Sequence, residues 1–245
     1  MKSIVLSCDK YHPMTNHMIL TYQKLWPSNS LEFLVPWNEK KPNHMIEDYG
    51  DSKVRLINTS VEFKKTISGL LDGVDDNEWI FWASDDTYLT KIDEEKANKV
   101  HSFVKSLDDN KKIGVTFGYI RQVPANSDKN NFLDYDDVRF IKRTFLTNQW
   151  AHQYWRAWVL RYMFDCIEEA PKYQAKAMDG MLGTKNRFWD ILTRGDMYTL
   201  DHNIATWGES TIRGKMAKSC FDSFNEYGLD IPKDFEQTNE SKYFI

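Results

Sequence analysis

An uninterrupted apolar run that ends in two adjacent carboxylates constrains the fold of this chain more than any other stretch of its sequence. The run occupies residues 79–83, follows a polar segment, and leads through Ser84 directly into Asp85 and Asp86. Five apolar residues between polar boundaries are typical of a short strand that is buried on both faces of a mainly parallel sheet. Because the carboxyl ends of such strands face the ligand crevice, we expect the acidic pair to lie there.

Asp85 and Asp86 repel each other unless a positive charge lies between them. A hard divalent cation that bridges the carboxylates to substrate phosphates is the usual partner of such a pair. The alternative is a solvated turn or a helix cap at the strand end, where the charges face water. The acidic pair alone leaves both interpretations open.

The first 90 residues alternate between expected strands and expected helices. Apolar, β-rich runs predict strands at 3–6, 31–35, 54–57 and 79–83. Helical spacing of apolar residues predicts one helix from Thr15 to near Pro27 and another from Phe63 to Leu71, with Gly73 as its stop. This alternation implies an α/β fold with a doubly wound, mainly parallel sheet that is flanked by helices.

The second half of the chain is less regular. Asp93 is placed to cap a helix that ends near Leu107. Beyond it the pattern predicts a strand at 112–117, a polar insertion at 120–139, an extended stretch at 140–150, a helix around 155–167, a helix at 179–192 broken by Gly180 and Gly183, and a strand at 197–200. Residues 206–245 are polar and end in a tail without clear periodicity.

Composition excludes several classes of protein. The net charge is −4 with both signs interspersed, which argues against nucleic acid as the main partner. The apolar core of the N-terminus is too short for a signal peptide or a transmembrane segment, so we expect a cytoplasmic protein. Three scattered cysteines without metal-site spacing favour a reducing compartment.

The order of these parts resembles the GT-A fold of glycosyltransferases over roughly residues 3–215. Members carry an Asp-any-Asp motif whose last acid binds a divalent metal, and here Ser84 replaces the first acid. The resemblance implies Asp86 as a metal ligand, Asp85 as a second ligand or a sugar-facing or ribose-facing residue, and His202 as a later ligand. Oxygen-rich ligation with one imidazole favours Mn²⁺ or Mg²⁺.

The same resemblance assigns donor-binding roles around the metal. The loop after the first strand is expected to bind the nucleobase and ribose of a nucleotide sugar through Ser7, Asp9 and Tyr11, although Asp9-Lys10-Tyr11 is also compatible with an ordinary turn. Arg213 and Lys215, on a later glycine-containing loop, are expected to close over the diphosphate.

Two acids are candidates for the base that deprotonates the acceptor hydroxyl. Asp179 is the first candidate and Glu209 is the second, while Gln149 and Trp150 are expected to contact the acceptor. Asp179 is equally compatible with a helix cap, and His202 with an ordinary surface or core histidine. Inversion by direct displacement is the favoured mechanism, and a retaining one stays open.

The sequence therefore predicts one domain over residues 1–245, with a nucleotide-sugar-binding half at about 1–117 and an acceptor-binding half at about 118–245. The expected activity is transfer of a sugar from a nucleoside-diphosphate sugar, with a UDP-sugar as the default, to a glycan or other hydroxyl acceptor, as in polysaccharide biosynthesis. The alternatives are a non-catalytic carbohydrate-binding or scaffold protein, a glycoside hydrolase, and a nucleotidyltransferase. The absence of glycine from residues 7–13 weighs against the last.

Overall fold

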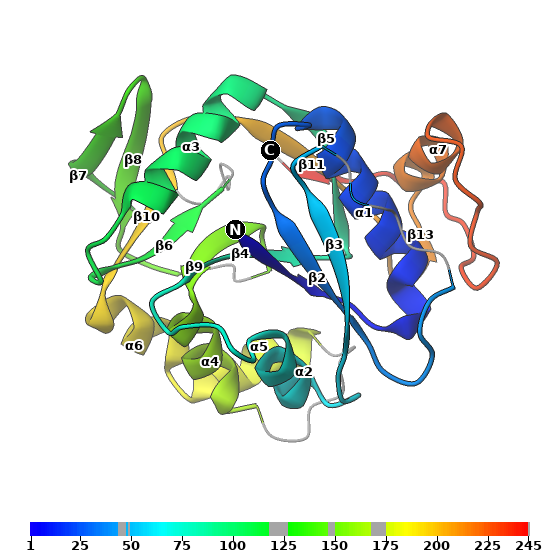
Figure 1. The fold of residues 1–245 in the computed structure, drawn as a ribbon, viewed down its shortest axis with the longest axis horizontal. Helices are drawn as coiled ribbons and strands as arrows, with labels where there is room; N and C mark the ends of the chain where they lie inside the picture. Colours follow the sequence, from blue (N-terminus) through cyan, green and yellow to red (C-terminus); the bar gives the residue numbers. More distant parts are fainter. Residues whose placement is uncertain (44–47, 49, 118–126, 147–149, 168–174, 245) are drawn as a thin grey trace.

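A nine-stranded sheet runs through the centre of the chain in the computed structural model, which describes residues 1–43, 48, 50–117, 127–146, 150–167 and 175–244 (Figure 1). Its strand order is β3-β2-β1-β4-β9-β6-β10-β8-β7. The strands, in chain order, are β1 (Lys2–Leu6), β2 (Glu32–Trp37), β3 (Lys53–Asn58), β4 (Trp79–Ser84), β6 (Lys112–Thr116), β7 (Ser127–Tyr135), β8 (Val138–Arg143), β9 (Gln153–Arg156) and β10 (Asp196–Leu200).

Most strands of this sheet point the same way. The four strands β3, β2, β1 and β4 are parallel, while β9 and β8 run against their neighbours. Ile4 of β1 lies opposite Leu34 on one side and Trp82 on the other, so β1 is an interior strand. The expected α/β class, with a mainly parallel sheet flanked by helices, is confirmed.

Helices cover both faces of the sheet, as the expected double winding requires (Figure 1). One face carries α1 (His12–Leu25) and α3 (Glu94–Ser106). Asp93 caps the first turn of α3, as predicted. The opposite face carries α2 (Phe63–Leu70), α4 (Ala157–Asp165), α5 (Ala175–Thr184) and α6 (Arg187–Arg194).

The central strand β4 is buried along its whole length, as its apolar run predicts. Phe81 and Ala83 pack on the α1 side, and Ile80 and Trp82 pack on the α2 side. Side chains of a strand alternate between the two faces of a sheet, so a continuous apolar run satisfies both cores at once. This double burial fixes the register that brings Ser84 to the carboxyl edge of the sheet.

A second sheet lies beside α1 and was not predicted. It joins β5 (Thr87–Ile92), β11 (Ala205–Glu209) and β14 (Tyr243–Phe244) in the order β14-β11-β5. A hairpin of β12 (Thr211–Ile212) and β13 (Lys215–Met216) follows, and then α7 (Lys218–Glu226). The segment 206–245 therefore contains regular elements, contrary to the expectation of a polar segment that ends in a tail without clear periodicity.

Three further expectations for the second half are wrong in part. Much of the expected polar insertion at 120–139 belongs to the hairpin of β7 and β8, an edge pair whose outer strand leaves most of its side chains in water. Trp155 lies in β9 and not in a helix. The break between α5 and α6 falls at Asn186, which has a φ of 53°, and not at the predicted glycines.

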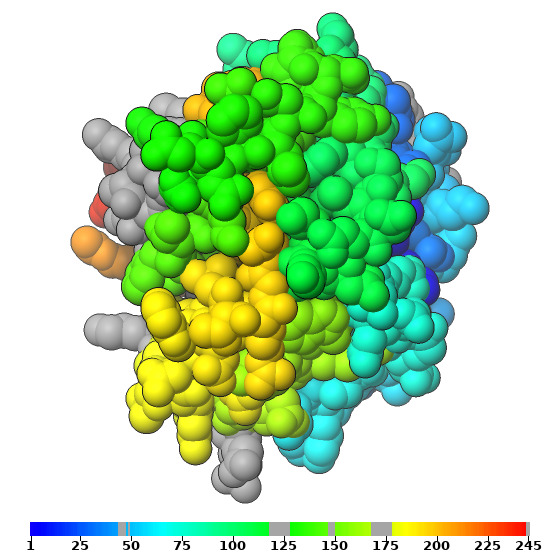
Figure 2. Space-filling model, turned by 90° about the vertical axis from the view of Figure 1, so that its left-hand side faces the viewer, coloured from blue at the N-terminus to red at the C-terminus, as the bar shows by residue number. Residues whose placement is uncertain are grey.

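Figure 2 shows the side of the molecule where the β7–β8 hairpin and α3 cover the upper part and α5 and α6 the lower part. Within the described ranges, no helix has the length and apolar character that crossing a membrane requires.

Candidate active site

The winding of the sheet reverses between β1 and β4. From β1 the chain passes through α1 to β2 and β3 on one side, and then returns through α2 to β4 on the other side of β1. Ligands of open α/β sheets bind outside the carboxyl ends of the strands at such a reversal. Here the two strand ends are tied together, because the Asp85 backbone N–H donates to the Leu6 carbonyl at 3.2 Å.

Asp85 and Asp86 form the turn between β4 and β5, at this reversal. The Asp85 side chain is buried, whereas Asp86 is exposed to solvent. Although Asp86 keeps contact with solvent, the protein around it still desolvates its carboxylate and raises its pKa, and the negative charge of Glu209 raises the pKa further. The acidic turn is thus a place where a cation would be stabilised.

Glu209 reaches the same turn from β11. It pairs with Thr87 across the β5–β11 ladder, and the next residue, Ser210, donates its N–H to the Asp86 carbonyl at 2.7 Å. Its carboxylate accepts a hydrogen bond from Lys242 Nζ at 2.7 Å. The residue before Glu209 is Gly208. A Cβ at this position would lie 2.6 Å from the Tyr88 ring, so the packing of Tyr88 requires a glycine here.

The loop after β1 faces the acidic turn through Tyr11. Burial raises the pKa of Tyr11, and the negative charges of Asp86 and Asp85 add to that rise. Its hydroxyl interacts with the Thr211 side chain, and its ring meets Phe235 edge-on at 5.1 Å between centroids. Tyr11 therefore lies between the acidic turn and the β12–β13 hairpin, and its predicted contact with a nucleobase stays a prediction.

Ser7 and Asp9 of the same loop are engaged with the protein itself. The Ser7 hydroxyl lies 2.6 Å from the Thr15 hydroxyl in the first turn of α1. Asp9 accepts backbone N–H groups of residues 38, 39 and 40, each at 2.8 Å. Desolvation opposes ionisation of Asp9, but these hydrogen bonds outweigh it and lower the pKa. Asp9 thus anchors the loop that follows β2.

Asp179 and Trp150, which the sequence assigns to the acceptor side, are brought together. The Trp150 indole Nε1 donates to Asp179 Oδ1 at 2.8 Å. The ring of Trp150 packs near Trp82 and Phe164, on the α2 face of the sheet beside the end of β4. Asp179 and Glu209, the two candidate bases, therefore lie on opposite faces of the central sheet.

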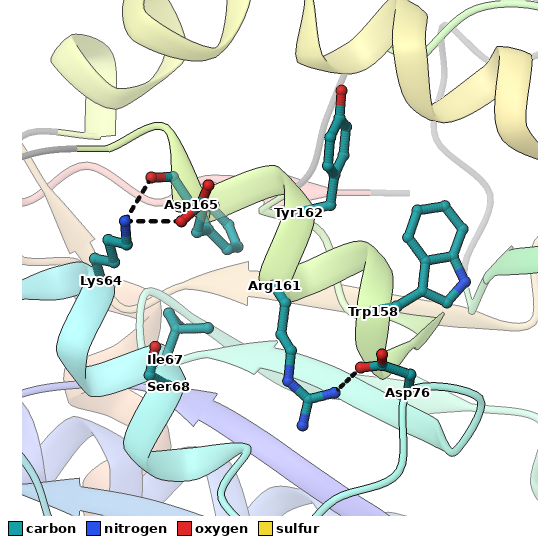
Figure 3. Close-up of a pocket in the computed structure, with 9 residues that line it drawn as sticks. Lys64, Ile67, Ser68, Asp76, Trp158, Arg161, Tyr162 and Asp165 are labelled. Atoms are coloured by element: carbon teal, nitrogen blue, oxygen red, sulfur yellow. Dashed lines mark hydrogen bonds and ion pairs between the residues drawn. The ribbon is translucent and has the colours of Figure 1, made fainter.

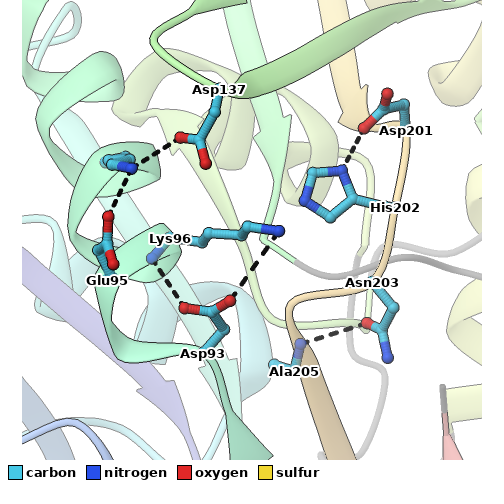
Figure 4. A network of polar contacts seen from close by, with 9 residues as sticks. Asp93, Glu95, Lys96, Asp137, Asp201, His202, Asn203 and Ala205 are labelled. Carbon is cyan, nitrogen blue, oxygen red and sulfur yellow. Dashed lines mark hydrogen bonds and ion pairs between the residues drawn. The ribbon is translucent and has the colours of Figure 1, made fainter.

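His202 lies apart from Asp86. It follows β10, and its Nδ1 is hydrogen-bonded to Asp201 (Figure 4). The chain then joins β11 at Ile204, whose carbonyl accepts the Asp93 N–H at the far end of β5 from Asp86. Six residues of strand separate these ends, roughly 20 Å at about 3.3 Å per residue. Asp86 and His202 are not brought to one point.

The remaining predicted residues fall on the hairpin or outside the described chain. Arg213 lies exposed in the β12–β13 turn with a φ of 53°, two residues beyond Thr211, which contacts Tyr11. Lys215 forms an ion pair with Glu236 at 2.7 Å. Gln149 lies outside the described residues.

His152 is a residue next to the acidic turn that the sequence analysis missed. Its Nδ1 lies 2.5 Å from the Tyr22 hydroxyl and its Nε2 lies 2.9 Å from the Thr87 hydroxyl. Trp207 Nε1 donates to the same Tyr22 oxygen at 3.2 Å. Burial lowers the pKa of His152 to about 4, so the ring is neutral near pH 7. This buried chain of hydrogen bonds supports the acidic turn from inside.

The donor set at the turn fits a hard divalent cation. In the described part of the chain, no three His, Cys, Asp or Glu side chains already converge on one point. Asp86, with Asp85 beside it in the turn, offers carboxylate oxygens, and the negative charge of Glu209 acts on Asp86. Mg²⁺ and similar ions commonly use one or two carboxylates and take their other ligands from water and substrate phosphates.

A cavity of about 450 Å³ lies elsewhere, between α2 and α4 (Figure 3). It is bordered by ion pairs between Lys64 and Asp165 and between Arg161 and Asp76. Asp76 precedes β4, so the cavity reaches the amino end of that strand, opposite the acidic turn. It is therefore separate from the candidate active site.

No family model and no curated protein matches this chain. Solved structures similar to it include a putative glucose-1-phosphate thymidylyltransferase from Bacillus anthracis, with 11% identity over 94% of this chain and 96% of the other and a TM-score of 0.46. The galactosyltransferase LgtC is 8% identical over 100% of this chain and 87% of its own, with a TM-score of 0.41. TarS from S. aureus is 15% identical over 83% of this chain and 58% of its own, also with a TM-score of 0.41. At these identities and TM-scores none of them assigns a role to a residue of this chain.

Proposed function

We propose that this protein is a metal-dependent glycosyltransferase that uses a nucleoside-diphosphate sugar as donor. The observation that carries the proposal is the position of Asp85 and Asp86 at the reversal between β1 and β4, opposite Tyr11. A nucleotide bound there places its base along the loop after β1 and its phosphates at the acidic turn. Acids at this point repel phosphate unless a cation lies between the two.

Asp86, with Asp85 beside it, would hold the divalent metal. When bound, the metal neutralises the charge that develops on the departing nucleoside diphosphate. Tyr11 offers an aromatic surface for the base. Arg213 is exposed on the β12–β13 turn, and its guanidinium would contact the diphosphate from the side of this hairpin.

The acceptor hydroxyl must lose a proton, and we propose that a carboxylate accepts it as the general base. Asp179 is the first choice because it lies on the exposed side of α5, with Trp150 holding one of its oxygens. Trp150 also offers a half-buried ring beside the end of β4 against which a sugar can stack. Glu209 is the second choice, and its carboxylate is already paired with Lys242.

Thermal-shift measurements test the proposal. The protein is heated with UDP, GDP, dTDP and ADP, each with and without Mn²⁺, because a ligand that binds only the native state raises the melting temperature. We expect one nucleoside diphosphate to raise it strongly only when Mn²⁺ is present. Stabilisation by a nucleoside triphosphate with turnover to pyrophosphate would instead make the protein a nucleotidyltransferase. Stabilisation by glycans without any nucleotide effect would make it a carbohydrate-binding protein.

A further inference from the structure

The C-terminal segment crosses the edge of the candidate active site. Its backbone is hydrogen-bonded to the β12–β13 hairpin, from the Met216 N–H to the Glu236 carbonyl at 2.7 Å and from the Thr238 N–H to the Met216 carbonyl at 3.0 Å. The segment then pairs as β14 with β11, with Tyr243 opposite Gly208. Its path is therefore fixed by main-chain contacts to the hairpin that follows Ser210 and to the strand that precedes it, and Ser210 itself donates its N–H to the Asp86 carbonyl.

This path places side chains at both ends of the site. Phe235 meets the edge of the Tyr11 ring at 5.1 Å, at the end proposed for the nucleobase. Lys242 lies at the other end, where the Glu209 N–H donates to its carbonyl at 2.9 Å and its Nζ donates to Glu209 Oε1 at 2.7 Å. Lys242 is thus held against Glu209 by its backbone and by its side chain.

The ion pair between Lys242 and Glu209 is asymmetric. The Glu209 side chain is 19% exposed, whereas the Lys242 side chain is 56% exposed. A lysine ammonium is a compact charge on a flexible stem, and exposed pairs of this kind hold their partners weakly. The ammonium can therefore leave Glu209 without disturbing the backbone pairing of β14.

The charges around the turn give this lysine a second partner. Glu209 pairs with Thr87, which follows Asp86, and Ser210 donates its N–H to the Asp86 carbonyl at 2.7 Å, so Lys242 is bound at the border of the acidic turn. A diphosphate that approaches a cation at Asp86 comes next to Glu209, which repels it. An ammonium beside Glu209 removes that repulsion and offers three N–H donors.

We infer that Lys242 binds a phosphate oxygen of the nucleoside diphosphate, and that it exchanges Glu209 for this oxygen when the donor enters. The inference rests on the proposed function and adds the C-terminal segment to the donor site. It makes Lys242 a donor-binding residue whose contact is specific to the phosphates and not to the nucleoside.

Calorimetric titration of Lys242→Met tests the assignment. The nucleoside diphosphate that binds the wild type most tightly among UDP, GDP and dTDP is titrated in Mn²⁺, and the parent nucleoside is measured by displacement. Loss of one hydrogen bond to a charged group predicts a fall in diphosphate affinity of roughly 10- to 100-fold. The nucleoside affinity should stay unchanged, and Lys242→Arg should retain most of the diphosphate affinity.

Lys218→Met is the matched control. Lys218 has a similarly exposed side chain, 54%, in an ion pair with Asp222 at 2.6 Å on α7. We expect it to bind the diphosphate like the wild type. Equal diphosphate affinity in Lys242→Met and the wild type would overturn only the role of Lys242, as would an equal loss for diphosphate and nucleoside. Failure of every nucleoside diphosphate to bind the wild type would overturn both this role and the proposed function.

Discussion

Glu209 and Asp86 lie at the same end of the β5–β11 pair, where desolvation raises the pKa of Asp86 and the negative charge of Glu209 raises it further. The two acids come from strands more than a hundred residues apart in the sequence. Like charges repel each other, and a cation bound between these two acids would relieve that repulsion. The charge of the acidic turn is therefore expected to change with pH.

Glu209→Gln should make cation binding persist to lower pH. Removing the charge of Glu209 lowers the pKa of Asp86, so Asp86 stays ionised in more acidic solution and competes better with protons for the metal. The measurement is Mn²⁺ affinity in the presence of nucleoside diphosphate as a function of pH. Glu226→Gln, on the exposed end of α7, is the control and should match the wild type. An unshifted pH midpoint in Glu209→Gln would show that the two acids are not coupled in solution.

Asp179→Asn should keep donor binding and lose turnover. The change preserves shape while removing the proton acceptor, and loss of a general base costs a factor of roughly 10² to 10⁴ in rate. Its effect is measured as kcat together with the melting temperature. Trp150→Phe keeps a ring near Phe164 but deletes the N–H donor to Asp179, so we expect a smaller loss of kcat.

Glu209→Gln is the comparison for that experiment, because Glu209 is the candidate base on the other face of the sheet. Normal turnover in Asp179→Asn together with a collapse in Glu209→Gln would transfer the role to Glu209. Normal turnover in both variants would point to a retaining mechanism or to no catalysis by these acids.

Acid should destabilise the protein through three buried histidines. Burial lowers the pKa of His17 to about 3 and those of His101 and His152 to about 4. The unfolded chain takes up protons on these residues near pH 6.5, whereas the native chain does so only at lower pH. The contribution of these histidines to the free energy of unfolding is therefore fully present above about pH 6.5. It falls toward pH 4 by up to about 1.4 kcal/mol per pH unit for each histidine.

Urea denaturation between pH 7.5 and 4.5 measures this slope, and His101→Gln isolates one histidine. The free energy of unfolding of the variant should change with pH by about 1.4 kcal/mol per pH unit less than that of the wild type, since glutamine does not titrate. A slope equal to that of the wild type would mean that His101 titrates in the native protein as it does in the unfolded chain, so that burial does not lower its pKa.

The first half of the fold was predictable because its signals are strong and local. The two-faced apolar run of β4 and the helical spacing in α1 and α2 each identify an element without knowledge of its neighbours. The strands β5, β11 and β14 could not be found this way. They are short, and their partners come from distant parts of the chain.

The candidate site was predictable where it follows strand ends and not where it depends on distant contacts. The positions of Asp85, Asp86 and Tyr11 follow from the alternation of strands and helices. His152 gave no signal, because its role arises from contacts with Tyr22 and Thr87, 130 and 65 residues away. The separation of His202 from Asp86 follows from the path of the chain into β11, which the sequence pattern does not reveal.

The central claim is that Asp86 holds a divalent metal, and that this metal binds the diphosphate of the donor. The most direct test is calorimetric titration of the best nucleoside diphosphate into wild type and Asp86→Asn, each with and without Mn²⁺. Asp72→Asn, an exposed acid beyond α2, serves as the control. We predict that Mn²⁺ strengthens nucleotide binding in the wild type and in Asp72→Asn but has no effect in Asp86→Asn. Equal Mn²⁺-dependent affinity in the wild type and Asp86→Asn would contradict the account.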